Sequence, residues 1–196
     1  MEKDRLGAFS DGVVAIIITI MVLELKAPHS AEWAALVALV PTFASYVLSF
    51  LYIAIYWNNH HHLLYTVARV NGLVLWANTH LLFWLSLIPF ATAWMADNHF
   101  ALAPTILYGV ALLMPAIAYY LLTLAIIRAE GGASVLAGAL GRDVKGKMSI
   151  ALYALALAAA FASPWFAIAI YVLVALMWLA PDPRIERLVG EGGDAS

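Results

Sequence analysis

The stretch RLGAFSDGVVAIIITIMVLEL, residues 5–25, decides the fold class of this protein. It has no charged residue between Asp11 and Glu24. A helix that crosses the hydrocarbon core of a bilayer needs about 20 mostly apolar residues, and we expect such a helix over Leu6–Leu25. A secretory signal also places an apolar stretch after a charged one, but here no clear cleavage site of small residues follows. We therefore expect this first helix to be retained.

The composition of the whole chain is that of a membrane protein. Of its 196 residues, 65% are hydrophobic and 11% are charged, and the mean hydropathy is +0.91. A soluble domain is about a quarter charged, because its surface faces water. The net charge of −2 gives no basic footprint for nucleic acid. The chain has no cysteine, which excludes disulfides, thiol nucleophiles and thiolate metal sites.

Further apolar segments predict an all-α membrane protein with six transmembrane helices. The last two share a nearly unbroken apolar run over residues 149–180, which as one helix would be about 48 Å long against a core of about 30 Å. Basic residues both precede and follow this run, and basic residues stay in the cytoplasm, so we expect a hairpin that turns at Ser163 and Pro164. The expected spans are Leu6–Leu25, Trp33–Trp57, Gly72–Met95, Ala101–Ile127, Met148–Ser163 and Trp165–Ala180.

The distribution of basic residues also predicts the orientation. With six spans, only Lys26 of the ten lysines and arginines falls on the side opposite the termini. The other nine are Lys3, Arg5, Arg69, Arg128, Arg142, Lys145, Lys147, Arg184 and Arg187. We therefore expect a multi-pass protein of the cell membrane (inner or plasma membrane) with both termini in the cytoplasm. We expect residues 1–189 to form one six-helix domain and residues 190–196 to form a disordered tail.

The first helix carries an apolar stripe. At about 100° per residue, one face about 100° wide collects three large apolar side chains and a threonine: Ile16, Thr19, Ile20 and Leu23. Phe9 and Gly12 extend this face toward the cytoplasm, whereas Asp11 points away from it. Apolar residues at helical spacing in a membrane protein are usually packed core or lipid-facing, so the spacing alone gives the stripe no function.

Ser10 and Asp11 lie near the cytoplasmic end of the same helix. A carboxylate within a span costs roughly 2.5–3.5 kcal/mol at the bilayer centre and less near the interface. Two interpretations are open. Either the two side chains cap the start of the helix, or they face the bundle and form a polar lock with donors on the second and third helices.

Histidines mark the next two helices. The sequence WNNHHH, residues 57–62, ends the second span, and His80 lies within the third. Consecutive helical residues project about 100° apart, so three in a row do not converge on one ion; we expect a wet interfacial turn at His60–His62 and no metal site. His80 is either a functional ionisable group within the membrane or a neutral histidine satisfied by one neighbour.

No motif in the sequence indicates an enzyme. It has no phosphate loop, no zinc-protease motif and no serine or cysteine nucleophile with a plausible partner. An arginine-rich voltage-sensing helix and a T-V-G-Y-G-type carbonyl filter are also absent from it. The carboxylates Asp11, Glu24 and Asp97 lie near span ends, whereas proton-coupled transporters commonly use acids at midspan.

Four residues of the first helix form the motif R-x-x-x-F-S-D: Arg5, Phe9, Ser10 and Asp11. This motif resembles the signature of the transmembrane protein 175 family. The likeness continues through WNNHH at 57–61, NTHLLF at 78–83 and SLIPF at 86–90. It covers the first half of the chain with specific motifs, and the second half only by helix count and hydropathy. The family comprises potassium-selective channels, and this chain, with one six-helix unit, resembles a prokaryotic member.

The resemblance implies a homotetramer around a central pore lined by the first helix of each subunit. It implies that the stripe Ile16, Thr19, Ile20 and Leu23 faces the pore. The large apolar side chains there, Ile16, Ile20 and Leu23, would form a hydrophobic constriction in place of a carbonyl filter. It also implies a structural lock that holds the first helix against the second and third, formed by Arg5, Phe9, Ser10, Asp11, Trp57, His61, Asn78 and His80. Potassium is then the permeant ion, and no cofactor is expected.

Two other functions fit the residues. One is a small secondary transporter or a proton-permeable channel that uses His80 and Asp11 as a relay. The other is a membrane scaffold without transport. A flux assay on purified protein distinguishes them, because a channel dissipates an ion gradient quickly, a transporter moves ions slowly and in a coupled manner, and a scaffold moves none.

Overall fold

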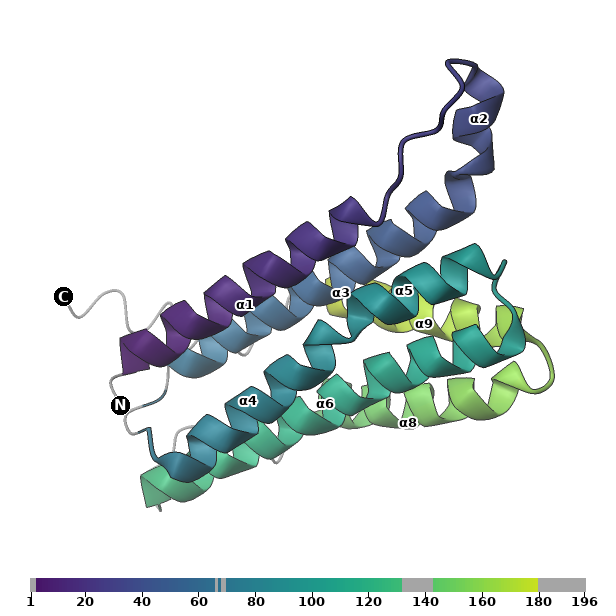
Figure 1. The fold of residues 1–196 in the computed structure, drawn as a ribbon. Coiled ribbons are helices and arrows are strands. Elements are labelled where there is room, and N and C mark those ends of the chain that lie inside the picture. Colours follow the sequence, from purple (N-terminus) through teal and green to yellow (C-terminus); the bar gives the residue numbers. More distant parts are fainter. Residues whose placement is uncertain (1–2, 66, 68–69, 132–142, 180–196) are drawn as a thin grey trace.

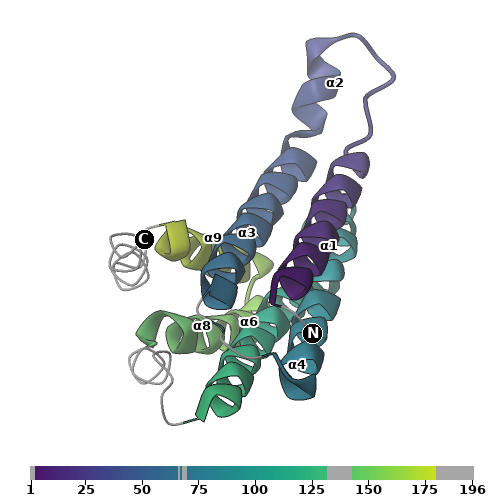
Figure 2. The same ribbon diagram turned by 90° about the vertical axis from the view of Figure 1, so that its left-hand side faces the viewer.

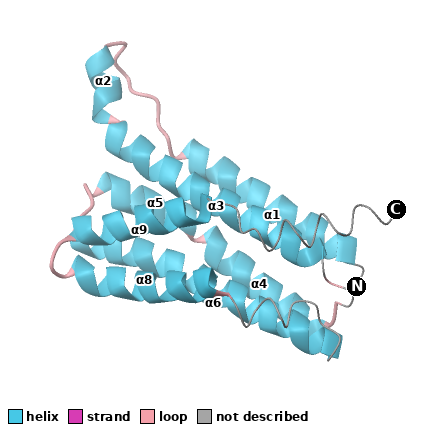
Figure 3. Ribbon diagram, turned by 180° about the vertical axis from the view of Figure 1, so that it is seen from behind, coloured by secondary structure: helices cyan, strands magenta, loops and turns pink. Residues whose placement is uncertain are grey.

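The computed structural model describes residues 3–65, 67, 70–131 and 143–179, and the regular elements of this part of the chain are α-helices (Figures 1 and 3). The expected all-α class is therefore confirmed. The helices are α1 (Lys3–Leu23), α2 (Trp33–Ala38), α3 (Val40–Tyr65), α4 (Gly72–Ser86), α5 (Ile88–Asp97), α6 (Leu102–Glu130), α8 (Val144–Ala160) and α9 (Pro164–Leu179).

Three prolines lie where helices begin. Pro41 is the second residue of α3, Pro89 the second of α5 and Pro164 the first of α9. The first four N–H groups of a helix have no partner within it, so a proline there costs no hydrogen bond. The helix before Pro41 ends with its C-cap at Leu39, between α2 and α3, and the helix before Pro89 ends with its C-cap at Leu87, between α4 and α5.

These breaks change two of the expected spans. The segment Trp33–Trp57 is divided into α2 and α3, and Gly72–Met95 is α4 followed by α5. The expected wet turn at His60–His62 is wrong, because α3 continues as a helix to Tyr65. The reason is packing: Leu63 and Leu64 are buried, so the helix keeps an apolar face against the bundle beyond the histidines.

The apolar run over residues 149–180 forms the expected hairpin. Helices α8 and α9 pack side by side and are joined by residues 161–163 (Figure 1). The Asp143 side chain caps α8, its Oδ1 accepting a hydrogen bond from the Gly146 N–H at 2.9 Å. With 16 residues, α9 rises only about 24 Å against a hydrocarbon core of about 30 Å. The last expected span is therefore an apolar helix that is shorter than the hydrocarbon core.

Four longer helical segments complete the membrane domain. By length and composition, α1, α3, Gly72–Asp97 and α6 are each able to cross a membrane. Helix α1 lies at one edge of the bundle and packs against α3, α4 and α5, whereas α6 lies between α4 and α8 (Figure 2). The start of α1, the end of α3, the start of α4 and the end of α6 lie at the same end of the bundle (Figure 1).

Four fully buried tyrosines hold the long helices to the hairpin: Tyr52, Tyr108, Tyr153 and Tyr171. The Tyr171 hydroxyl donates to the Thr105 carbonyl at 3.2 Å, and the Tyr108 and Ser49 hydroxyls are hydrogen-bonded at 2.9 Å. No buried side-chain nitrogen or oxygen of the described residues lacks a partner. Lipid offers no hydrogen bonds to such groups, so the protein must satisfy them internally.

Candidate functional site

Helix α1 has two different faces. Its buried residues are Leu6, Ser10, Val14, Ile17 and Met21, spaced three or four apart. A second face bears Phe9, Ile16, Thr19, Ile20 and Leu23, all exposed in the single chain. The contrast is sharpest between neighbours, since 60% of Ile16 is exposed and only 3% of Ile17. One face of α1 therefore packs into its own subunit, and the other presents large apolar side chains outward.

A buried chain of polar side chains, the polar lock, fixes α1 against α3 and α4. The Ser10 hydroxyl donates to the Leu6 carbonyl at 2.8 Å and accepts from Asn78 Nδ2 at 3.0 Å. On its other side, Asn78 Oδ1 accepts from His60 Nε2 at 2.6 Å. Because the amide oxygen only accepts, the His60 proton lies on Nε2. Asn78 is completely buried, so each hydrogen bond lies where water does not compete for it.

A second hydrogen bond joins α1 to α3 at the edge of the subunit. Trp57 Nε1 donates to Asp11 Oδ1 at 2.9 Å. Asp11 is exposed in the single chain, and 43% of Trp57 is exposed. Ser10 and Asp11 are consecutive residues of α1, and they bond to two different helices, Ser10 to Asn78 of α4 and Asp11 to Trp57 of α3. Together the two bonds therefore set the rotation of α1 about its axis.

Other residues that the motif suggested for the lock lie elsewhere. His80 Nε2 accepts from Trp84 Nε1 at 2.8 Å within α4. His61 is exposed, and its ring lies 6.0 Å from that of Trp57. In the described structure, neither histidine forms a hydrogen bond with α1. Phe9 and Arg5 are exposed on α1 in the single chain.

His60 is the lock residue that sequence reasoning missed. Spacing offers a signal for it: His60 is seven residues after Ile53 and eleven after Ser49, so all three share one face of α3, and all are buried. Because α3 is helical through residues 60–62, its three consecutive histidines point in different directions. In the described residues, no three histidine, aspartate or glutamate side chains gather where one metal ion would reach them.

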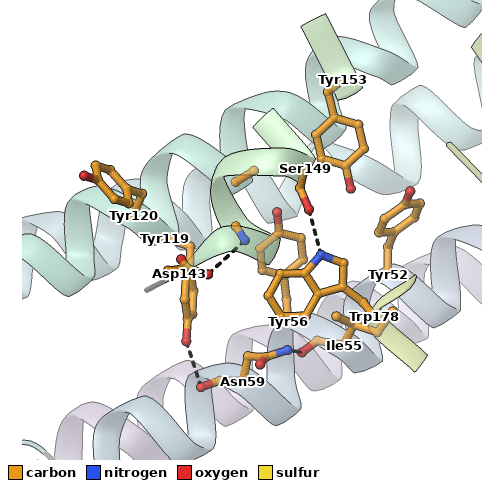
Figure 4. A pocket seen from close by; sticks show the side chains of 12 residues that line it. Tyr52, Ile55, Tyr56, Asn59, Tyr119, Tyr120, Asp143, Ser149, Tyr153 and Trp178 are labelled. Carbon is orange, nitrogen blue, oxygen red and sulfur yellow. Dashed lines mark hydrogen bonds between the residues drawn. The ribbon is translucent and has the colours of Figure 1, made fainter. Parts of the chain in front are cut away.

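A small cavity lies between α3, α6 and the hairpin of α8 and α9 (Figure 4). It has a volume of about 50 Å³ and is lined mainly by aromatic side chains of α3, α6 and the hairpin. Tyr119 donates to the Asn59 carbonyl at 3.0 Å, and Trp178 Nε1 donates to the Ser149 hydroxyl at 2.8 Å. Among the described residues, those that line it include none from α1, so this cavity is separate from the outward face of α1.

Comparison with known proteins identifies the family. The family model described as the endosomal/lysosomal potassium channel TMEM175 matches residues 5–89. A protein of Chryseobacterium sp. (strain P1-3), named a potassium channel, is 56% identical over 191 residues, which are 97% of this chain and 100% of that relative. The chain belongs to the TMEM175 family. The family resemblance inferred from the motifs is thus confirmed, and the chain is not an enzyme.

Other TMEM175 relatives agree with this membership. A protein of Streptomyces collinus, also named a potassium channel, is 42% identical over 100 residues, 49% of this chain and 48% of that protein. The crystal structure of a lysosomal potassium-selective channel TMEM175 homolog from Chamaesiphon minutus matches with a TM-score of 0.70 and 29% identity, over 91% of this chain and 96% of that one. Residues 5–89 include the outward face of α1 and every residue of the polar lock.

Proposed function

We propose that this chain is a subunit of a potassium-selective ion channel in which four identical copies of α1 line a central pore. One observation carries the proposal. Helix α1 is held in a fixed rotation by buried hydrogen bonds, yet it turns Ile16, Ile20 and Leu23 outward. Packing within one subunit leaves these side chains without a partner, and a second layer of α1 helices would supply one. The relatives named as potassium channels give the permeant ion.

The apolar side chains of this face form the constriction. Four copies of Ile16 around an axis make a narrow apolar ring, and Ile20 and Leu23 add further rings along α1. A narrow apolar ring excludes water, so ions pass only when it widens enough to be wetted. The gate therefore needs no charged side chain within the pore.

Thr19 supplies oxygen atoms next to these rings. Its hydroxyl donates to the Ala15 carbonyl at 2.8 Å, so the proton is directed along the helix. The remaining lone pairs of Oγ1 are free to face a cation, because a hydroxyl has two acceptor sites. Four Thr19 oxygens would replace part of the hydration shell that a potassium ion loses in the constriction.

The polar lock, together with the bond between Asp11 and Trp57, keeps this face directed at the axis. Ser10 and Asn78 hold α1 to α4, and Asp11 and Trp57 hold it to α3. A rotation of α1 by one residue, about 100°, would replace Ile16 with Ile17 or Ala15 at the axis. The lock thus acts on permeation through the orientation of α1 and touches no ion.

The channel lies in the cell membrane with both termini in the cytoplasm. The basic residues Lys3, Arg5 and Arg128 belong to the end of the bundle where α1 begins and α6 ends, and Lys26 follows the opposite end of α1 (Figure 1). Basic residues stay on the cytoplasmic side. The domain comprises residues 1–189, and its expected tail, residues 190–196, lies outside the described residues.

A relay through His80 and Asp11 has no support in the geometry. Each group is hydrogen-bonded to a different tryptophan, His80 to Trp84 and Asp11 to Trp57. Proton transfer between two groups requires a hydrogen bond or a bridging water, and the described side chains form no hydrogen-bonded path from one to the other. A potassium channel accounts for the outward apolar face of α1, whereas a relay leaves it without a role.

Flux through reconstituted protein tests the function. Purified protein in liposomes loaded with potassium should dissipate the gradient rapidly when a proton ionophore balances the charge, and planar bilayers should show unitary current steps. Replacing potassium with sodium should lower the flux strongly. Slow, saturable flux coupled to protons would indicate a transporter, and equal passage of sodium and potassium would contradict potassium selectivity.

A further inference from the structure

The outward face of α1 does not end at its apolar residues. Helix α1 is continuous from Lys3 to Leu23, so helical spacing applies along its whole length. Arg5 is eleven residues before Ile16, which places it about 20° from Ile16 around the helix axis. Phe9 and Gly12 lie between them on the same face, and Arg5, Phe9 and Gly12 are all exposed. The face that bears the apolar rings thus begins with an arginine.

Arg5 differs from its neighbours in how it is held. The Lys3 ammonium donates to the Tyr65 carbonyl at 2.9 Å and lies 5.1 Å from the centre of the Tyr65 ring, which fastens it to the end of α3. Within the described part of the chain, the Arg5 guanidinium has no hydrogen-bond or ion-pair partner. Asp4 is adjacent but lies about 100° around the helix from Arg5. Arg5 is therefore the cation of this end of α1 that shares the direction of Ile16.

We propose that four copies of Arg5 form a positive ring at the cytoplasmic mouth of the pore and reduce outward potassium current. This inference rests on the proposed function, because it requires α1 to line the pore. A ring of like charge lowers the local concentration of cations at the entrance and raises that of anions. Potassium ions that enter from the cytoplasm meet this ring before the constriction, whereas ions that enter from outside meet it last. The ring thus favours inward over outward current.

The effect must depend on ionic strength. The Debye length is about 30 Å at 0.01 M salt and about 3 Å at 1 M. Repulsion by the ring therefore reaches across the mouth at low salt and is screened within it at high salt. A residue that merely stabilised the fold would change the current by a similar factor at both concentrations.

The test compares two single-charge deletions in excised inside-out patches. Arg5→Gln should raise the outward current about two- to fivefold in symmetrical 10 mM potassium chloride, and the increase should nearly vanish at 1 M. Lys3→Gln removes the same charge two residues away, but about 140° from Ile16 around the helix, and should leave the ratio of outward to inward current nearly unchanged. Equal effects of the two variants at 10 mM would overturn the proposal.

A second variant allows the charge at position 5 to be changed after the channel has assembled. The chain has no cysteine, so Arg5→Cys creates a unique thiol that reagents reach in the finished channel from the bath. A negatively charged methanethiosulfonate should increase outward current, and a positively charged one should decrease it. A thiol that does not react, or current that responds equally to both reagents, would overturn the ring. Failure of the proposed function is distinct, since the unmodified protein would then carry no potassium current at all.

Discussion

The Asn78 amide donates a hydrogen bond to the Ser10 hydroxyl at 3.0 Å, between residues 68 positions apart in the chain. Both residues are buried, and Asn78 also accepts from His60. Three helices therefore meet in one polar chain inside an apolar bundle. In such surroundings an unpaired polar group cannot form a hydrogen bond with water instead. These hydrogen bonds therefore favour one rotation of α1 over the others.

Removing the Ser10 hydroxyl should destabilise this junction. Ser10→Ala leaves the Asn78 amide without its acceptor, at a cost of about 1–3 kcal/mol. The melting temperature of the purified protein, followed by the loss of its oligomer peak in size-exclusion chromatography, should fall. The control is a double-mutant cycle with Asn78→Ala. The second substitution should cost less in the Ser10→Ala background than alone, and purely additive losses would mean that the two side chains do not act together.

The bond between Asp11 and Trp57 should be structural. Asp11→Ala leaves the indole N–H unpaired, so we expect reduced assembly and expression rather than a stable channel with altered selectivity. Trp57→Phe breaks the same bond from the other side and should reproduce the loss. A well-assembled Asp11→Ala channel with a changed ion preference would place the carboxylate beside the ions instead.

Gly109 should be intolerant of a side chain. A Cβ at this position would collide with the hydroxyl of Tyr171, which is fully buried. Gly109→Ala should therefore lower the melting temperature, since α6 and α9 would have to separate. Tyr171→Phe removes the hydroxyl but not the nearby ring carbon, so the double variant should recover part of the loss. A double variant less stable than Gly109→Ala would contradict this account.

The orientation follows from the basic residues and is open to labelling. Single cysteines introduced at Ser30 and Asp97 should react with a membrane-impermeant maleimide in intact cells, because Ser30 follows the outer end of α1 and Asp97 is the last residue of α5. The chain has no cysteine of its own, so the background is low. A cysteine at Ser134, outside the described residues, should react only after the cells are lysed. Labelling of Ser134 in intact cells would invert the topology.

Hydropathy and helical spacing predicted much of this structure. The stripe through Ile16 and Leu23 was visible in the sequence because 100° per residue is fixed by backbone geometry. The turn before Pro164 was visible because the apolar run exceeds the thickness of a bilayer. Both inferences depend on local properties of the chain, which a single sequence contains.

Hydropathy alone did not choose between neighbouring residues of the same type, because that choice depends on which face of each helix is buried. Among three consecutive histidines, the buried face of α3 selects His60 for the hydrogen bond to Asn78 and leaves His61 exposed. His80 lies two residues after Asn78, yet it bonds to Trp84 on its own helix. The helix boundary at Leu87 was missed for a similar reason, because hydropathy does not distinguish one continuous span from two stacked helices.

The paired substitutions Ile16→Asn and Ile17→Asn test the central claim, that the outward face of α1 forms the constriction of a potassium-selective pore. They change composition identically and differ only in direction, since Ile16 is exposed and Ile17 is buried within the subunit. Asparagine is smaller than isoleucine and supplies hydrogen-bond partners, so four copies at position 16 would let water and hydrated ions occupy the ring. The decisive measurement is the reversal potential under a sodium–potassium gradient. We predict higher conductance and a loss of potassium preference for Ile16→Asn, with near-normal selectivity for any assembled Ile17→Asn. Altered selectivity in Ile17→Asn alone would mean that the pore face is misassigned, and unchanged selectivity in both would mean that α1 does not form the constriction.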